Sequence, residues 1–252
     1  MEQKDAAGRF SGRIALVTGA GRGLGESIAD TLAAEGATVL GTSRSLEEAQ
    51  RIAERYGSPA VVLDATDTAS IAPTIQRALE RVGRIDLLVN NAGVNVPQPA
   101  LEVTEADWDA VHSLNVKGTF FVTQTLARHW VAENRAGAVV TVGSQAGIVA
   151  IEDRAGYGSS KAAVAQLTRQ LAFEWGQYGI RVNALAPTFV PTELTASTLA
   201  RPEVAERLLG RIPLGRFGTA QEVAEAVAFL LSDQAALITG HVLVADGGYT
   251  IH

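Results

Sequence analysis

The sequence predicts an α/β fold in which a doubly wound, seven-stranded parallel sheet lies between two layers of helices. Strand-like apolar runs alternate with helical patterns along the whole chain, and no linker, repeat or low-complexity tract interrupts the series. A chain of 252 residues is long for one domain, yet α/β folds often reach this length with a single sheet. We therefore expect one domain over residues 1–252, with a core at 12–187 and a substrate lid at 188–216.

The first strand and the first helix enclose a glycine-rich loop. Ile14–Val17 is a short apolar run typical of a buried strand. A helix is predicted after it, because Leu24, Ile28 and Leu32 are spaced by four. Gly36 follows as the stop signal of that helix.

The loop at 18–25 has the pattern G-x-x-x-G-x-G. Glycine lets the backbone turn tightly and approach a pyrophosphate closely, and the start of the next helix offers free N–H groups and a positive dipole end. A glycine-rich turn between a strand and a helix can also be only a turn, so the motif alone leaves both interpretations open. If the loop binds a dinucleotide, the contacts fall on Gly19, Arg22, Gly23, Leu24 and Gly25.

The other elements alternate in the same way. Further strands are predicted at Thr38–Thr42, Ala60–Leu63, Leu87–Val89, Ala138–Val142, Arg181–Leu185 and His241–Val244. Helices are predicted at Leu46–Tyr56, Ile71–Val82, Asp107–Asn134, Tyr157–Trp175 and Ala220–Leu231. Thr219 and Glu222 form a capping box at the start of the last helix, and Thr104 precedes Asp107 at the same spacing. We expect the crossovers between parallel strands to be right-handed. In a sheet of this kind a ligand binds across the carboxyl ends of the strands.

Tyr157 and Lys161 carry the strongest chemical signal. They are four residues apart on one predicted helix, so both side chains project from the same face. The pKa of a free tyrosine is about 10, and lowering it to about 7 requires roughly 4 kcal/mol in favour of the phenolate. The Lys161 cation supplies part of that free energy. Ser144, at the end of a predicted strand, can donate a hydrogen bond to the oxygen that Tyr157 protonates.

Taken together, these motifs resemble the short-chain dehydrogenase/reductase family over nearly the whole length of the chain. The resemblance rests on Thr18-Gly19-x3-Gly23-x-Gly25, Asn90-Asn91-Ala92-Gly93, Asn115, Ser144, Tyr157-x3-Lys161 and Pro187–Thr192. It implies a Rossmann-type fold and hydride transfer between NAD(P) and an alcohol or ketone. It also implies that Tyr157 is the acid/base, that Lys161 lowers the pKa of Tyr157 and holds the nicotinamide ribose, and that Ser144 polarises the substrate oxygen. Asn115 would anchor a proton-relay water; without the family it would be interpreted as a packing or kink residue.

The segment after the second strand bears on the choice of nicotinamide cofactor. An acidic side chain at this place usually binds the ribose hydroxyls of NAD, but the chain has Thr42, Ser43 and Arg44 there. Arg44 and the two hydroxyls favour a 2′-phosphate, and Arg22 can add a second cation. NADP(H) is therefore the preferred cofactor and NAD(H) a possible one, although Arg44 could also be an ordinary solvated arginine.

Other cofactor contacts follow from the family pattern. Asp64 matches a position that contacts adenine, although it could equally cap the next helix. Asn91 would pack against the adenosine ribose, and Gly93 completes the same motif, which could also be only a turn. The loop after the sixth strand departs from the family, because Thr188 stands where most members have glycine after Pro187. The list of expected contacts in this loop is Pro187, the backbone of Val190 at the nicotinamide carboxamide, and the hydroxyl of Thr192 at the pyrophosphate.

The substrate is less well defined. The lid, Asn95–Gln98, Gln145 and Ile148–Arg154 give the pocket a mixed polar character, which suits a sugar acid, ketose or polyol. The chain also resembles 3-oxoacyl-(acyl-carrier-protein) reductases around Gly41-Thr42 and at 142–147. Such enzymes need basic residues at the mouth of the site; Arg135 could serve, but Tyr178 and the acidic balance of the chain offer little else. A third hypothesis, a dinucleotide-binding sensor or scaffold without turnover, is disfavoured because Asn115, Ser144, Tyr157 and Lys161 are all present.

Composition narrows the setting. The absence of cysteine excludes disulfides and thiol catalysis, and it fits a reducing cytoplasm. The polar N-terminal stretch at 1–13 lacks the apolar core of a signal peptide, and no run approaches a membrane span. A net charge of −6 disfavours nucleic acid and anionic membranes as partners. The four histidines show no ligand spacing, so no metal is expected.

Self-association is also expected from the resemblance. Members of the family usually pair the helices equivalent to Asp107–Asn134 and Tyr157–Trp175, which suggests a homotetramer or homodimer. Apolar side chains on these helices permit such pairing, although they could also face the sheet: Phe120, Phe121, Leu167, Leu171 and Trp175. The C-terminal segment at 247–252 could line a second interface or reach a neighbour's pocket.

Overall fold

The computed structural model of the chain describes residues 8–251. Most of the N-terminal stretch at 1–13 and the last residue of the C-terminal segment, His252, therefore lie outside the described residues, as do the predictions made for them. The strands are β1 (Ile14–Thr18), β2 (Thr38–Ser43), β3 (Val61–Val62), β4 (Leu87–Asn90), β5 (Gly137–Val142), β6 (Ile180–Pro187) and β7 (Val242–Ala245). The helices are α1 (Gly23–Ala34), α2 (Leu46–Tyr56), α3 (Thr68–Val82), α4 (Glu105–His112), α5 (Thr119–Ala132), α6 (Ala155–Trp175), α7 (Glu193–Leu199), α8 (Pro202–Leu209) and α9 (Ala220–Leu231).

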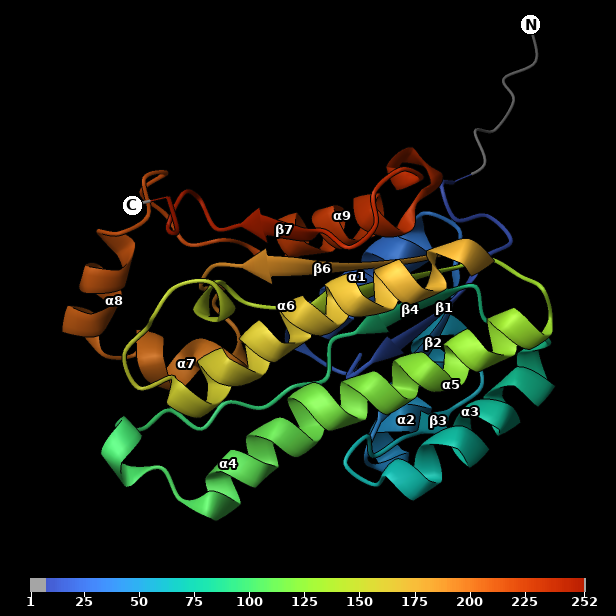
Figure 1. Cartoon of the computed structure of the whole chain (residues 1–252), viewed down its shortest axis with the longest axis horizontal. Coiled ribbons are helices and arrows are strands. Elements are labelled where there is room, and N and C mark those ends of the chain that lie inside the picture. The colour runs from blue at the N-terminus through green and yellow to red at the C-terminus, as the bar shows by residue number, and fades with distance from the viewer. Residues whose placement is uncertain (1–7, 252) are drawn as a thin grey trace, which may run out of the picture.

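The strands form one parallel sheet in the order β3-β2-β1-β4-β5-β6-β7, with helices on both faces (Figure 1). This order reverses direction at β1, so the chain winds away from the centre twice. The predicted fold class, a doubly wound Rossmann-type sheet in a three-layer α/β/α arrangement, is confirmed. The carboxyl ends of β1, β4, β5 and β6 meet at one edge, and the arrows of β6 and β7 point towards α7 and α8 in Figure 1.

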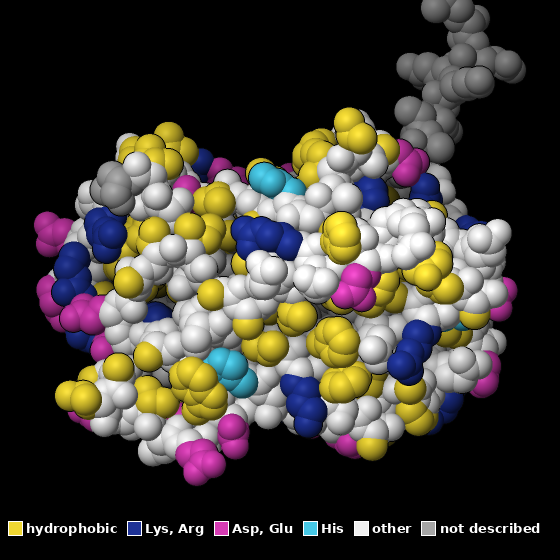
Figure 2. Space-filling view, in the orientation of Figure 1, with side chains coloured by type: hydrophobic (Ala, Val, Ile, Leu, Met, Phe, Trp, Pro, Cys, Tyr) yellow, Lys and Arg dark blue, Asp and Glu magenta, His cyan; other side chains and the backbone are white. Residues whose placement is uncertain are grey.

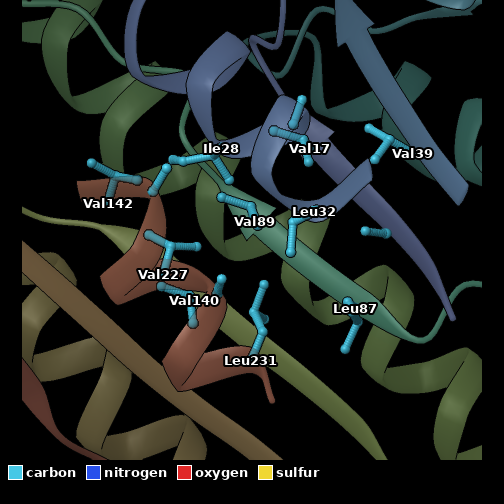
Figure 3. Close-up of a cluster of buried hydrophobic side chains, with 14 of the residues drawn as sticks. Val17, Ile28, Leu32, Val39, Leu87, Val89, Val140, Val142, Val227 and Leu231 are labelled. Atoms are coloured by element: carbon cyan, nitrogen blue, oxygen red, sulfur yellow. The ribbon is translucent and has the colours of Figure 1, made fainter. Parts of the chain in front are cut away.

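Strand alternation divides the core between the two faces of the sheet. In β1, Ala15 and Val17 point to one face and Leu16 to the other, as successive side chains of a strand must. The first face is covered by α1 and α9, whose side chains, among them Ile28 and Val227, pack on the strands (Figure 3). On the second face α3, α5 and α6 supply the partners of the strand residues, and Trp130 of α5 is completely buried there. Both faces are thus apolar, which explains why the strands read as short continuous apolar runs.

Helix ends agree with the predicted capping signals. The hydroxyl of Thr219 accepts a hydrogen bond from the backbone N–H of Glu222 at 3.2 Å, and the Glu222 carboxylate accepts one from the N–H of Thr219 at 2.9 Å. Thr104 caps α4 in the same way, by accepting from the N–H of Asp107 at 3.1 Å. These hydrogen bonds satisfy N–H groups that a helix start leaves unpaired, and those at Thr219 and Glu222 are reciprocal.

One predicted helix contains a π-helical turn. The helix predicted at 107–134 is present from Glu105 to Ala132, and a π-helical turn at Ser113–Gly118 joins α4 to α5 within it. Gly118 in this turn lies so close to the neighbouring loop that a Cβ would be 2.4 Å from the carbonyl oxygen of Ala65. The wider turn also directs Asn115 towards the loop after β4, as described below. A π-turn within an α-helix often marks a functional site.

The segment at 188–216 contains two short helices that were not predicted, α7 and α8. Val204 and Leu208 of α8 pack with Phe189, Ile212 and Tyr249 in a small third apolar cluster. This cluster ties α8 to the C-terminal segment rather than to the sheet. The segment therefore has its own core beside the carboxyl edge of the sheet.

Candidate active site

A cleft of about 1130 Å³ opens at the carboxyl edge of the sheet. Its wall is built from the glycine-rich loop after β1, the loop after β4, the end of β5, the first turn of α6, and the segment that leads from β6 into α7. The predicted site residues that line it are Gly19, Arg22, Gly23, Leu24, Asn91, Gly93, Ser144, Tyr157, Lys161, Pro187, Val190 and Thr192. Residues from five separate parts of the sequence thus meet in one cleft.

The glycine-rich loop has the geometry that a pyrophosphate requires. Gly19 and Gly23 adopt φ values of 65° and 57°, in the left-handed region that favours glycine. Gly25 has no room for a side chain, because a Cβ would be 2.1 Å from the carbonyl oxygen of Gly19. At the N-cap of α1, Arg22 has an extended backbone and makes no capping hydrogen bond with its side chain. The first amide groups of α1 are therefore available to an anion, and the loop fits a dinucleotide.

Two polar side chains hold this loop in place. The Asn91 amide donates to the carbonyl oxygens of Thr18 and Gly19 at 3.1 and 3.0 Å. The hydroxyl of Thr18 in turn accepts from the N–H groups of Asn91 and Ala92, each at 3.0 Å. Asn91 therefore fastens the loop after β4 to the glycine loop. The part played by Thr18 was not predicted, although it is the first residue of the recognised motif.

Tyr157, Lys161 and Ser144 lie together at the floor of the cleft. Tyr157 and Lys161 come from the first two turns of α6, and Ser144 lies two residues after the end of β5. The Lys161 ammonium is buried, lies 5.5 Å from the centroid of the Tyr157 ring, and donates a hydrogen bond to the carbonyl oxygen of Val142 at 2.8 Å. The Ser144 hydroxyl accepts from the N–H of Ala146 at 3.1 Å, which fixes its position at the start of a short 3₁₀ turn.

Burial is the largest influence on the pKa values of Tyr157 and Lys161. Burial raises the pKa of Tyr157 above its usual value, although a hydrogen bond with Ser144 and the positive charge of Arg154 both act to lower it. Burial also lowers the pKa of Lys161 to about 8. In the protein without ligands, desolvation of the phenol therefore outweighs these two effects, and the lowering of the Tyr157 pKa by Lys161 stays a prediction.

Asn115 lies behind the cleft and braces it. Its side-chain oxygen accepts from the N–H of Val94 at 2.9 Å, and its amide donates to the Val94 carbonyl at 2.9 Å and to the Ser160 hydroxyl at 3.0 Å. Ser160 is completely buried and donates to the carbonyl oxygen of Tyr157 at 2.7 Å. The π-turn is thereby connected to the backbone that carries Tyr157. Ser160 was not singled out from the sequence, since a small polar residue in a helix gives no signal by itself.

A smaller pocket of about 600 Å³ adjoins the glycine loop at the end of β2. Thr42, Ser43 and Arg44 line it together with Arg22, so the two predicted cations share one pocket. Glu48 of α2 lines it too, and its carboxylate accepts a hydrogen bond from the Ser43 hydroxyl. The proton of Ser43 is therefore engaged by a carboxylate that the sequence gave no reason to place there.

Two predicted contacts, Asp64 and Arg22, have partners within the protein in this structure. Asp64 accepts from the N–H and the hydroxyl of Thr66 at 2.9 and 2.7 Å, which makes it part of the turn before α3. It lines neither the cleft nor the smaller pocket, whereas its neighbours Leu63 and Ala65 line the latter. Arg22 forms an ion pair with Glu193 at the start of α7, across the mouth of the cleft. A ligand at this mouth would compete with that ion pair.

The departure at Thr188 is accommodated by the backbone. Among the described residues other than glycine, only Asn134 and Asp153 have positive φ, so Thr188 is not strained by the conformation that glycine would favour. The carbonyl oxygen of Val190 accepts from the Thr195 hydroxyl at 2.6 Å, and the N–H of Thr192 donates to the same hydroxyl at 3.0 Å. Thr195 thus organises the loop that was predicted to meet the nicotinamide.

Two further features bear on function. None of the helices in the described part of the chain is long and apolar enough to cross a membrane. Within residues 8–251, no three or more His, Asp or Glu side chains gather in a way that could hold a metal ion.

Comparisons with known proteins found a matching family model and similar proteins. A family model described as enoyl-(acyl carrier protein) reductase matches residues 19–250. The chain is 40% identical over 248 residues to a D-threitol dehydrogenase of Mycolicibacterium smegmatis, with 96% of this chain and 95% of the relative covered. It is 38% identical over 241 residues to the 3-oxoacyl-(acyl-carrier-protein) reductase FabG of Escherichia coli, covering 95% and 98%.

A solved structure is also similar over its full length. The gluconate 5-dehydrogenase of Burkholderia cenocepacia, crystallised in complex with NADP and tartrate, superposes with a TM-score of 0.93 at 35% identity. The superposition covers 98% of this chain and 99% of that one.

Proposed function

The chain belongs to the short-chain dehydrogenase/reductase family, and on this premise we propose that it is an NADP(H)-dependent oxidoreductase that interconverts a ketone and a secondary alcohol. The observation that carries the proposal is the meeting of Ser144, Tyr157 and Lys161 in the cleft that the glycine-rich loop lines. A proton donor, a hydrogen-bond donor and a buried cation lie beside a loop that fits a pyrophosphate. That combination suits the reduction of a carbonyl group.

The chemistry divides between the cofactor and the chain. When bound, the reduced nicotinamide supplies a hydride to the carbonyl carbon. Ser144 donates a hydrogen bond to the carbonyl oxygen and holds it, and Tyr157 transfers its phenolic proton to that oxygen as negative charge develops. A neutral phenol is the form needed for this step, and the raised pKa of Tyr157 keeps it neutral. Lys161 stabilises the phenolate that remains, and solvent returns the proton. The oxidation of an alcohol follows the same steps in reverse.

We propose NADP(H) over NAD(H) because two arginines line the pocket at the end of β2. Arg44 is exposed there, and Arg22 shares the pocket with it. Glu48 opposes this preference, since its carboxylate would repel a 2′-phosphate. In the Arg44→Ala variant, kcat/KM for NADPH should fall by about 10- to 100-fold, as expected for the loss of a charged hydrogen bond. The value for NADH should change little; equal losses with both cofactors would contradict the assignment.

The substrate is proposed to be a small polar carbonyl compound or alcohol, such as a sugar acid, ketose or polyol. The similarity to a D-threitol dehydrogenase and a gluconate 5-dehydrogenase supports this class. A 3-oxoacyl-(acyl-carrier-protein) reductase is the second candidate, supported by the similarity to FabG. Arginines also lie on the segment beside the cleft, at Arg201, Arg207 and Arg211, but Arg201 and Arg207 are paired with glutamates.

The proposal is tested with a panel of ketoses, sugar acids, polyols and 3-oxoacyl thioesters, each assayed with NADP(H) and NAD(H) by the absorbance of the reduced nicotinamide. Turnover of a polyol or sugar acid with NADP(H), at a kcat/KM at least about 100-fold above that for the thioesters, supports the first candidate. Preference for thioesters favours the second. Absence of turnover throughout the panel would contradict the proposed class of substrate.

The same proposal includes self-association and location. We propose a homodimer or homotetramer that pairs α5 and α6. Figure 2 shows hydrophobic side chains over the face that these helices form, and Phe173 of α6 is 86% exposed. Phe120, Phe121 and Trp175 pack against the sheet instead. Light scattering should show an oligomer for the wild type and a weaker one for Phe173→Glu, because the new charge lies in the proposed interface.

We also propose a cytoplasmic location. The chain has no cysteine and so forms no disulfide, which fits a reducing compartment.

A further inference from the structure

Arg154 is an arginine without an acidic partner at the floor of the cleft. It immediately precedes α6, three residues before Tyr157, and lines both the cleft and an adjoining cavity beneath α7 and α8. Its guanidinium donates to the backbone carbonyl of Asp153 at 3.1 Å and to the hydroxyl of Thr198 at 2.9 Å. Both acceptors are neutral. No ion pair with a carboxylate forms at Arg154 within the described residues, in contrast to Arg207 nearby, which pairs with Glu152.

This position is unfavourable for an unpaired charge. The Arg154 side chain is half-buried, and burial lowers its pKa, while the nearby Asp153 and Tyr157 only partly offset that effect. An arginine that is held out of water without a carboxylate is stabilised when an anion binds to it. Its planar fork can bind a carboxylate through two parallel hydrogen bonds. A structural role alone would be served by the bond to Thr198 and would not require a charged group.

Unpaired polar atoms lie in the wall of the same cleft. Gln145, adjacent to Ser144, is 2% exposed, and neither its amide oxygen nor its amide nitrogen has a hydrogen-bond partner. The side-chain oxygens of Asn95 and Thr188 are also buried without partners. All three residues line the cleft. Buried donors and acceptors of this kind favour a ligand that carries hydroxyl groups, because a purely apolar ligand would leave them unpaired.

We propose that Arg154 binds a carboxylate of the substrate and Gln145 one of its hydroxyls, so that the substrate is a small polyhydroxy acid and its keto acid product. This inference rests on the proposed function, since it places the acid in the cleft where Tyr157 exchanges the proton. An uncharged polyol satisfies Gln145 but leaves Arg154 unpaired. The acyl chain of an acyl thioester offers a hydrogen-bond partner to neither Arg154 nor Gln145.

The experiment compares acids with alcohols of the same carbon skeleton. Gluconate and glucitol, and galactonate and galactitol, differ at one end by a carboxylate in place of CH₂OH. For the wild type, kcat/KM should be higher for each acid than for its alditol. In Arg154→Gln the acid-to-alditol ratio should fall by about 10- to 100-fold, mainly through KM, as for a lost charged hydrogen bond. Arg154→Lys should keep part of the ratio, because it keeps the charge and loses the fork.

The ratio is the informative readout because Arg154 also acts on the pKa of Tyr157, and that effect applies equally to the acid and to the alditol. Arg207→Gln is the matched control, since Arg207 lines only the adjoining cavity and is paired with Glu152. Its ratio should equal that of the wild type. An unchanged ratio in Arg154→Gln, or a wild type that prefers alditols, would overturn the inference. A loss in Arg154→Gln that is confined to acyl thioesters would do the same.

A binding measurement separates this inference from the proposed function. Calorimetric titration of each acid and its alditol measures binding and needs no turnover. Tartrate and threitol, which share a four-carbon skeleton, are titrated in the same way as the two longer pairs. If no redox activity is found but acids bind the wild type and not Arg154→Gln, the proposed function fails and the carboxylate site stands. If turnover is found and Arg154→Gln keeps the acid preference, the function stands and this inference fails. Failure of every acid to bind the wild type more tightly than its alditol also contradicts it.

Discussion

Replacement of Lys161 by methionine should stabilise the protein at about pH 7 while it abolishes the chemistry. Burial lowers the pKa of Lys161 to about 8, and this displacement from the ordinary lysine value corresponds to about 3 kcal/mol against the charged form. Methionine removes that cost with little change in volume. The hydrogen bond to the Val142 carbonyl is lost as well, at about 1 kcal/mol. The free energy of unfolding should therefore rise by about 2 kcal/mol.

The pH dependence of this difference identifies its cause. Between about pH 8 and about pH 10.5 the lysine of the unfolded chain is protonated and that of the folded protein is not. The unfolded state then binds more protons, so the stability of the wild type rises with pH through this window. The advantage of Lys161→Met should shrink by about 2 kcal/mol between about pH 7 and about pH 10, and should nearly vanish at the upper value.

Urea denaturation of the protein without cofactor, at both pH values, measures the difference. Lys117 is exposed, so Lys117→Met serves as the control and should change stability by less than about 0.5 kcal/mol at either pH. The reasoning is refuted if Lys161→Met is less stable than the wild type at about pH 7, or if its advantage is the same at both values. Either outcome would mean that the ammonium is better solvated in the folded protein than its burial indicates.

Three other substitutions test the supports of the site. Gly25→Ala puts a Cβ 2.1 Å from a backbone oxygen, so it should lower the free energy of unfolding by about 1–3 kcal/mol and weaken cofactor binding in a fluorescence titration. In the control Gly176→Ala the new Cβ meets nothing within 4 Å, so stability and cofactor binding should not change. Ser160→Ala breaks the connection between the π-turn and α6 and should lower the free energy of unfolding in urea by about 1–2 kcal/mol. Its kcat should fall by a larger factor than its KM for cofactor rises. An unchanged kcat would show that the connection is not needed. Glu48→Gln should raise the ratio of kcat/KM with NADPH to that with NADH by a few-fold, and a constant ratio would place the Glu48 carboxylate away from the bound phosphate.

Local signals in the sequence account for most of the fold. The apolar runs and the helical spacing predicted the strands and six of the helices to within a few residues, and the capping box at Thr219 marks the start of α9 as found. The differences at the ends of strands arise from pairing: β6 continues to Pro187, because its last residues are still opposite β7. Periodicity cannot show where a ladder with a distant strand stops.

The π-turn at Ser113–Gly118 could not be predicted in this way. Its residues continue the helical spacing of the sequence, and what distinguishes it is contact with distant parts of the chain, since Asn115 bonds to Val94 and Ser160. Resemblance to the family pointed to Asn115, but only the fold shows the hydrogen bonds that it makes.

Charged partners in the candidate site were missed for the same reason. Arg22 and Glu193 are far apart in the sequence and meet across the cleft. Glu48 and Ser43 are separated by five residues, but the turn from β2 into α2 sets their hydrogen bond. Arg154 was included only as one of several residues at the mouth of the pocket, and its lack of a carboxylate partner becomes visible only in three dimensions.

The role of Tyr157 as the proton donor is tested most directly by Tyr157→Phe, which keeps the ring and removes the hydroxyl. The measurement is the rate of hydride transfer in a single turnover, with cofactor affinity determined by fluorescence titration of the same samples. We predict a rate lower by about 10²- to 10⁴-fold, the usual contribution of general acid catalysis, and an affinity within about 3-fold of the wild type. A variant that transfers hydride at the wild-type rate would contradict the role of Tyr157 as the proton donor.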